Sequence, residues 1–288
     1  MSMTINTNIA SLNAQRNTAN NTLSLSTTMQ RLSSGLRINS AKDDAAGLAI
    51  ADRMNTQIRG MNVAVRNAGD AISMAQVAEG GLSAMNDMLQ RMRELAVQAS
   101  NAPNSVGASG DIAKLNNEYK QLGAELDRML SATQFNGEQI LNGSADYVFQ
   151  VGANAGTENR ITITSGDISL NSAAAADFAV VTTGAASALE LSAAVDNTAK
   201  IAALDNAISA VNDRRASLGA LQSRFENTIA YLRTAGENQS AARSRIMDAD
   251  FAAETANLSR TQILQQAGTA MIAQANQLPQ NVLKLLQG

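Results

Sequence analysis

The residue types that most often carry enzyme chemistry are missing from this chain. It contains no His and no Cys, which removes the usual general base near neutral pH, the Ser-His pair, thiolate nucleophiles and common zinc sites. Two carboxylate clusters remain, Asp43–Asp44 and Asp248–Asp250, and either could bind a cation. Each directly precedes a predicted helix, where a carboxylate stabilises the free N–H groups of the first turn. We therefore predict helix-starting carboxylates, and no catalytic residue, cofactor or metal ion.

Composition and charge exclude several other classes of protein. The net charge is −3 and charged residues make up 16% of the 288 residues, so no basic block is present to bind nucleic acid. No apolar run is long enough to span a membrane. The opening residues also lack the pattern of a Sec signal peptide, so we expect any export to use another route. Aromatic residues make up only 3%, which favours long packed helices over a conventional globular core.

Both ends of the chain carry apolar residues at helical spacing beside neutral polar residues. The steps of three and four residues predict one apolar face on each terminal helix. The polar positions between them are mostly Asn, Gln, Ser and Thr, so little charge opposes contact with another chain. The residues that we expect to mediate self-assembly are Ile5, Ile9, Leu12, Leu23, Leu32, Leu264, Met271, Leu278, Val282 and Leu285.

Long helices are predicted between the terminal segments. After a break near 37–43, apolar residues step by three and four through 44–99, interrupted only by Gly80 and Gly81. A shorter helix follows over 112–129. A third begins near residue 193 and carries a heptad repeat, the signature of coiled-coil packing. The repeating positions are Leu204, Val211, Leu218, Phe225 and Leu232.

The apolar period changes from helical to alternating between residues 147 and 164. This alternation, with a turn over 152–159, predicts a β-hairpin. Residues 171–192 are rich in Ala and Ser and could form either a second strand pair, at 178–183, or a loop. The fold class that we predict is mainly α: a long antiparallel, coiled-coil-like helical rod, with a small β-hairpin region at the far end from the termini.

The terminal helices also suggest a mechanism of association. Isolated helices are marginally stable in water, and within the chain the terminal apolar faces have only each other to pack against. We expect these helices to be frayed in a free monomer and to fold as they enter a polymer. A contact between unlike surfaces that does not close generates an open helical filament.

Several segments of the chain resemble bacterial flagellin. The matching runs are Thr4–Asn8, Leu32–Gly47, Gln90–Gln98, Thr133–Gly137, Gln150–Asn154 and Leu278–Leu283, in the family's order. They cover both arms of the chain and are highly specific. The region between the hairpin and the returning helix is short, so the chain resembles a short form without large outer domains.

The resemblance implies the domain organisation and the role of the protein. Residues 1–43 and 248–288 would form the inner terminal-helix coiled coil, 44–144 and 193–247 the helical rod, and 145–192 the hairpin and a short variable region. The implied role is a secreted structural subunit that polymerises with itself into the extracellular flagellar filament used for swimming.

Partners are also implied by the resemblance. They are the hook-associated junction and cap proteins, a flagellar export chaperone and, in a host, the Toll-like receptor of innate immunity. The receptor patch of the family maps onto Arg91, Leu95 and Glu118. From the residues alone, Arg91 would be part of a solvated helix face.

Other functions stay open at this point. A hook–filament junction protein would share the terminal helices, and a secreted helical-bundle adhesin or effector would share the composition. Electron microscopy of the purified chain separates these, because only a filament subunit forms long uniform filaments. A lytic enzyme is disfavoured by the absence of His.

Overall fold

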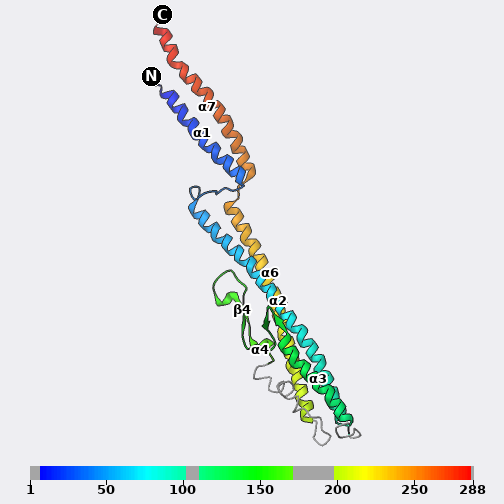
Figure 1. Ribbon diagram of the computed structural model, residues 1–288. Helices are drawn as coiled ribbons and strands as arrows, with labels where there is room; N and C mark the ends of the chain where they lie inside the picture. The colour runs from blue at the N-terminus through cyan, green and yellow to red at the C-terminus, as the bar shows by residue number, and fades with distance from the viewer. Residues whose placement is uncertain (1–6, 102–109, 171–197, 287–288) are drawn as a thin grey trace. The chain divides into compact units, whose positions relative to one another are not determined.

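The computed structural model describes residues 7–101, 110–170 and 198–286, and the chain divides into two compact units (Figure 1). Unit 1 comprises residues 1–56 and 237–288, and unit 2 comprises residues 57–236. The long helices are α1 Ile9–Ser34, α2 Ala45–Ala99, α3 Asp111–Ala132, α6 Thr198–Met247 and α7 Phe251–Leu286. Short elements are β1 Gln134–Phe135, β2 Glu138–Gln139, β3 Tyr147–Gln150, η1 Thr157–Asn159, β4 Arg160–Ile163 and α4 Ser165–Ile168.

The architecture is mainly helical with small antiparallel strand pairs, as the sequence predicts. The possible strand pair at 178–183 lies outside the described residues. Within the described part of the chain, no helix is long and apolar enough to cross a bilayer.

Helix α1 begins and ends at residues with clear capping roles. The side chain of Asn8 accepts a hydrogen bond from the Ser11 N–H at 3.1 Å, which satisfies one free donor of the first turn. At the other end, Gly35 adopts a left-handed φ of 71° and its N–H donates to the Arg31 carbonyl. Glycine is the residue that occupies this conformation without steric cost.

Two of the carboxylates singled out in the sequence, Asp44 and Asp250, act as helix caps. Asp44 Oδ1 accepts from the Gly47 N–H at 2.8 Å at the start of α2, and Asp250 Oδ1 accepts from the Ala252 N–H at 2.9 Å at the start of α7. Asp43 accepts from the Ser40 N–H and hydroxyl. Hydrogen bonds from the Ser40 and Asn39 N–H groups hold the pKa of Asp43 below its ordinary value. The helix-start interpretation is confirmed at Asp44 and Asp250.

The two breaks in the helices of unit 1 pair with each other. The Arg37 N–H donates to the Met247 carbonyl at 2.7 Å, and the Ala249 N–H donates to the Gly35 carbonyl at 2.9 Å. Ile38, only 2% exposed, packs beside Met247 in a small apolar cluster. The predicted break near 37–43 is thus an ordered crossing, tied down by backbone hydrogen bonds.

The core of unit 2 is built from the helical repeats read in the sequence. All of the predicted heptad residues of α6 are buried, from Leu204 to Leu232. On α2, the predicted series continues through Leu82, Met85, Leu89 and Met92, each of which is 0% exposed. Tyr119 of α3 completes this core; burial raises its pKa to about 12. The predicted helical rod packing is therefore confirmed within unit 2.

The predicted β-hairpin is present in unit 2 and packs along α2. Strands β3 and β4 pair antiparallel, with Tyr147 opposite Ile163 and Gln150 opposite Arg160. The Asn67 side chain on α2 donates to the Gln150 carbonyl at 2.9 Å. A side chain added at Gly60 would meet the Ala153 Cβ at 2.8 Å, so glycine at this position allows the hairpin loop to approach the helix closely.

Adjacent glycines at the middle of α2 have different surroundings. They interrupt the apolar pattern of the sequence, but α2 is one continuous helix from Ala45 to Ala99. A Cβ added at Gly80 would meet no atom within 4 Å, whereas one added at Gly81 would meet the Leu141 Cδ1 and the Thr133 Oγ1 at 3.0 Å. Gly81 therefore makes room for the loop after α3, while Gly80 has no such role inside unit 2.

Gly80→Ala is expected to stabilise unit 2 by about 0.5–1 kcal/mol, because alanine loses less backbone entropy in a helix and meets no neighbour. Gly81→Ala is the matched control and should gain less or destabilise, since its methyl group crowds two side chains. Urea unfolding followed by far-UV circular dichroism measures both. Equal effects at the two positions would contradict this account of the glycines.

Candidate functional site

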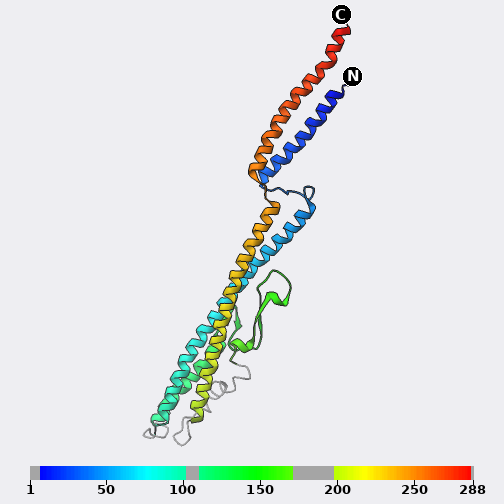
Figure 2. The ribbon, with the colours of Figure 1, turned by 180° about the vertical axis from the view of Figure 1, so that it is seen from behind.

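Helices α1 and α7 of unit 1 form an antiparallel pair. They run side by side in opposite views (Figures 1 and 2). The Asn8 side chain donates to the Ala275 carbonyl at 2.8 Å, and the Ser11 hydroxyl donates to Asn276 Oδ1 at 2.7 Å. The described hydrogen bonds place the start of α1 beside the later part of α7.

The seam between these helices combines small and polar residues with a few large apolar ones. Two heptad series are buried or half-buried and face each other across it. They are Ser11, Ala14, Thr18, Asn21, Leu25, Thr28 and Leu32 on α1, and Glu254, Leu258, Thr261, Gln265, Gly268, Ile272 and Ala275 on α7. A Cβ added at Gly268 would meet the Thr18 Oγ1 at 2.6 Å, so the backbones approach closely there.

A seam of this composition contributes less hydrophobic stabilisation than a seam of fully buried Leu and Ile residues. Ser11 and Thr28 are among its most buried members, and each offers far less apolar area than a buried Leu or Ile. Glu254 is 9% exposed, and its carboxylate lies 3.9 Å from Arg31 Nη1, near the limit of an ion pair. Burial of a carboxylate with so distant a partner does not favour the pair strongly.

Several large apolar side chains of both helices point away from the seam. The exposed fractions are 70% for Ile9, 56% for Leu12, 69% for Leu23, 65% for Ile263, 43% for Leu264 and 62% for Met271. Of the apolar stripes read in the sequence, Leu32 and Ala275 lie in the seam, whereas these six side chains face outward or are largely exposed. Side chains of this size rarely gather in exposed rows unless another molecule covers them.

The remaining predicted self-assembly residues lie in different environments. Leu32 is half-buried at the end of the seam. Leu278, Val282 and Leu285 belong to α7, but their side chains lie outside the described part, as does Ile5. The seam itself was missed from the sequence, although small residues at heptad spacing, such as Ser11 and Thr18 on α1 and Gly268 and Ala275 on α7, were a signal that could have revealed it.

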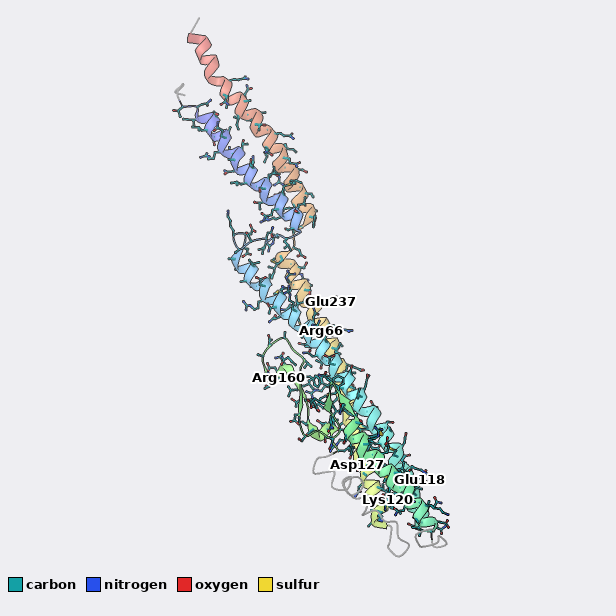
Figure 3. The ribbon with its side chains drawn as sticks, in the orientation of Figure 1. Arg66, Glu118, Lys120, Asp127, Arg160 and Glu237 are labelled. Atoms are coloured by element: carbon teal, nitrogen blue, oxygen red, sulfur yellow. The ribbon has the colours of Figure 1, made fainter. Side chains whose placement is uncertain are left out.

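The residues mapped to a receptor patch occupy contrasting positions in unit 2. Arg91 and Glu118 are exposed and joined by an ion pair at 2.9 Å, with Glu118 on α3 (Figure 3). Arg91 also bonds Glu94 at 2.9 Å; hydrogen bonds to Glu94 and Glu118 raise the pKa of Arg91 above its ordinary value. Leu95 is 0% exposed. The side chain of Leu95 on α2 thus lies in the core, and of the three mapped residues only Arg91 and Glu118 are at the surface.

A second ion pair, between Arg93 and Asp205, connects α2 to α6 in unit 2. The hydrogen bond from Arg93 holds the pKa of Asp205 below its ordinary value. Because the folded-state pKa is depressed, this pair contributes to stability above the unfolded-state pKa of the carboxyl. The contribution is lost as the pH falls through the folded-state value.

No group of three or more His, Cys, Asp or Glu side chains is arranged to hold a metal ion in the described ranges. In unit 1, the feature that indicates binding to another molecule is instead the set of exposed apolar side chains on α1 and α7.

Comparison with known families and proteins gives consistent matches along the chain. The family described as the bacterial flagellin N-terminal helical region matches residues 5–146. The family described as the bacterial flagellin C-terminal helical region matches residues 201–286. Together these matches cover both helical arms.

Individual relatives match over nearly the whole chain. A flagellin of Halalkalibacterium halodurans is 46% identical over 287 residues, covering 99% of this chain and 100% of the relative. The flagellar filament 33 kDa core protein of Treponema phagedenis is 42% identical, covering 99% of this chain and 100% of the relative. A crystal structure of Bacillus cereus flagellin is 29% identical, with a TM-score of 0.47, and covers 62% of this chain and 94% of that chain.

Proposed function

Because the chain belongs to the bacterial flagellin family, it is a structural subunit of the flagellar filament, and we propose that it polymerises through the exposed rows of α1 and α7. The observation that carries this proposal is the outward direction of Ile9, Leu12, Leu23, Leu264 and Met271. Each such side chain, when covered by a neighbouring copy, contributes about 1.5–3 kcal/mol. Ile5, Leu32, Leu278, Val282 and Leu285 extend the same assembly segments.

Assembly and folding of the terminal helices are coupled in this proposal. Ordering each residue costs about 1–2 kcal/mol, and the polar seam between α1 and α7 offsets only part of that cost. The terminal pair therefore becomes stable when neighbouring copies cover its apolar rows. Addition at a filament tip, where several neighbours are already in place, is favoured over association of two free chains.

We propose a domain organisation in three parts. The inner coiled coil comprises residues 1–43 and 248–288, the helical rod comprises 44–144 and 193–247, and residues 145–192 form the hairpin and a short variable region. The continuous core of unit 2 supports a rod that folds before assembly. The partly polar seam of the terminal pair supports an inner coiled coil that becomes stable only on assembly.

Membership of a structural family of the flagellum supports a proposal for the partners and the location of the chain. We propose that the chain is exported and acts outside the cell, without catalysis and without a cofactor. Its partners would be other copies, the hook-associated junction and cap proteins, an export chaperone and the host Toll-like receptor. For the receptor, Arg91 and Glu118 would supply the contact surface, and Leu95 would hold α2 in place beneath them.

Deletion of residues 264–288 tests this function directly. The deletion removes Leu264 and Met271 of α7 and leaves the buried residues of unit 2 intact, so unit 2 should fold but the chain should form no filament. Electron microscopy of the purified chain and swimming of cells that express it as their only flagellin measure the two consequences. Long filaments from the shortened chain would contradict the proposal.

A further inference from the structure

The sequence contains two Asn-Gly pairs, Asn136-Gly137 and Asn142-Gly143, and both lie in unit 2. Asparagine is a chemically labile residue. A following glycine increases this lability, because it has no side chain to shield its main-chain nitrogen and its backbone moves easily. That nitrogen attacks the side-chain amide carbon of the asparagine when the two atoms approach each other. In a folded chain, the rate of this attack depends on how freely the local backbone moves.

Asn136 and Gly137 form the exposed tip of the turn between β1 and β2. Strand pairing places Phe135 opposite Glu138, so these two residues make up the whole loop, and both are exposed. The hydrogen bond that closes such a turn is donated by the residue after the loop, and no described backbone hydrogen bond involves the Gly137 N–H. A Cβ added at Gly137 would meet no atom within 4 Å. Nothing in the described part of the chain therefore holds the Gly137 nitrogen away from the Asn136 side chain.

Asn142 and Gly143 have the same two residue types but lie in a packed segment. Both are half-buried. The preceding residue, Leu141, is 0% exposed, and its carbonyl accepts a hydrogen bond from the Leu170 N–H at 3.0 Å. A Cβ added at Gly143 would meet the Gln139 carbonyl oxygen at 2.7 Å, so the backbone is crowded on that side. These contacts restrict the movement that would bring the Gly143 nitrogen to the Asn142 side chain.

We propose that Asn136 is a site of spontaneous deamidation in the folded chain and that packing protects Asn142 from the same reaction. The Gly137 nitrogen forms a bond to Cγ of Asn136, and the bond between Cγ and Nδ2 breaks. The side-chain nitrogen takes up the proton lost by the Gly137 nitrogen and leaves as ammonia, which gives a five-membered succinimide ring. Water then adds to either ring carbonyl and opens the ring to an aspartyl or an isoaspartyl residue. Water is the only co-reactant that these steps require.

Both products change the turn and leave the rest of unit 2 intact. Each adds a carboxylate close to Glu138 in the sequence, and the isoaspartyl product also lengthens the main chain by a methylene group. The base of the turn is held separately, because the Ile140 N–H donates to the Thr133 carbonyl at 3.2 Å and Ile140 is 1% exposed. The chain thus gains negative charge with time at one surface turn, a property that goes beyond its proposed function.

Incubation of the purified full-length chain at mildly alkaline pH tests the proposal, since the attacking nitrogen must lose its proton. Cleavage after Glu138 places the two asparagines on different peptides. Mass spectrometry then measures the conversion of each amide to an acid, and an isoaspartyl methyltransferase with a labelled methyl donor detects the isoaspartyl product. In the folded chain, Asn136 should react about tenfold or more faster than Asn142, a difference of about 1.4 kcal/mol or more in activation free energy.

The same chain unfolded in guanidinium chloride is the matched control. Without packing, both Asn-Gly pairs should react at similar rates, so the difference in the folded chain reports the structure. Asn136→Gln, whose longer side chain does not form the five-membered ring, should lose the signal at this position and leave the rate at Asn142 unchanged. Equal rates at the two asparagines in the folded chain, a faster reaction at Asn142, or no reaction at Asn136 would overturn the inference.

Discussion

Leu264→Lys combined with Met271→Lys is expected to abolish filament assembly while the isolated chain keeps its helical content and the stability of unit 2. Both side chains are exposed, at 43% and 62%, so lysines there remain solvated in the free chain. In the polymer, each substitution removes about 1.5–3 kcal/mol of apolar burial and adds an unpaired charge. The combined loss raises the concentration needed for assembly by on the order of a hundredfold or more.

The same two charges placed on the polar side of α7 form the control. Gln262→Lys combined with Gln266→Lys adds identical charge to the same helix at exposed positions. Sedimentation and electron microscopy at a series of chain concentrations compare the two double variants. We expect a much larger assembly defect in Leu264→Lys combined with Met271→Lys. Normal filaments from that variant, or an equal defect in the control, would refute a role for Leu264 and Met271 in assembly.

Phe225→Ala is expected to lower the free energy of unfolding of unit 2 by about 3–5 kcal/mol, the usual cost of truncating a fully buried aromatic residue. Phe225 is 0% exposed, and its ring meets the Phe149 ring edge to face, with centroids 5.9 Å apart. The substitution therefore opens a cavity and also removes the aromatic contact that holds the hairpin to α6.

Tyr231→Ala is the control on the same helix. Its side chain is 71% exposed, so truncation should change the stability by less than about 0.5 kcal/mol. Urea unfolding of both variants, followed by far-UV circular dichroism, gives the two values. A loss below about 1 kcal/mol for Phe225→Ala would mean that the hairpin and α6 do not form one cooperative core.

The rod was predictable because its packing follows a single rule. In α6, the heptad from Leu204 to Leu232 uses large apolar residues. Burying them within one chain gives the largest hydrophobic stabilisation that these residues can contribute. The hairpin was predictable for a similar reason, since Tyr147, Phe149 and Ile161 follow the period of a strand. At the Asn136-Gly137 turn, φ values of 52° and 84° match the conformation that this pair favours.

The terminal helices were predicted as elements, but their orientation was not. Apolar periodicity marks Leu12, Leu23 and Leu264 as one face of a helix, and the simplest interpretation turns such faces toward each other. The structure instead pairs positions such as Ser11, Thr18 and Gly268, because small residues allow two backbones to approach closely. A single sequence does not reveal which of two competing faces a neighbouring copy will cover.

The most direct test is hydrogen exchange of the backbone amides in α1 and α7, measured for the free chain and for the assembled filament. The account predicts rapid exchange over residues 9–34 and 251–286 in the free chain at low concentration, with strong protection in the filament. The core of α2 and α6 in unit 2 should be protected in both states and serves as the internal reference. Strong protection of α1 and α7 in the free chain would contradict the claim that copies of the same chain complete the terminal pair.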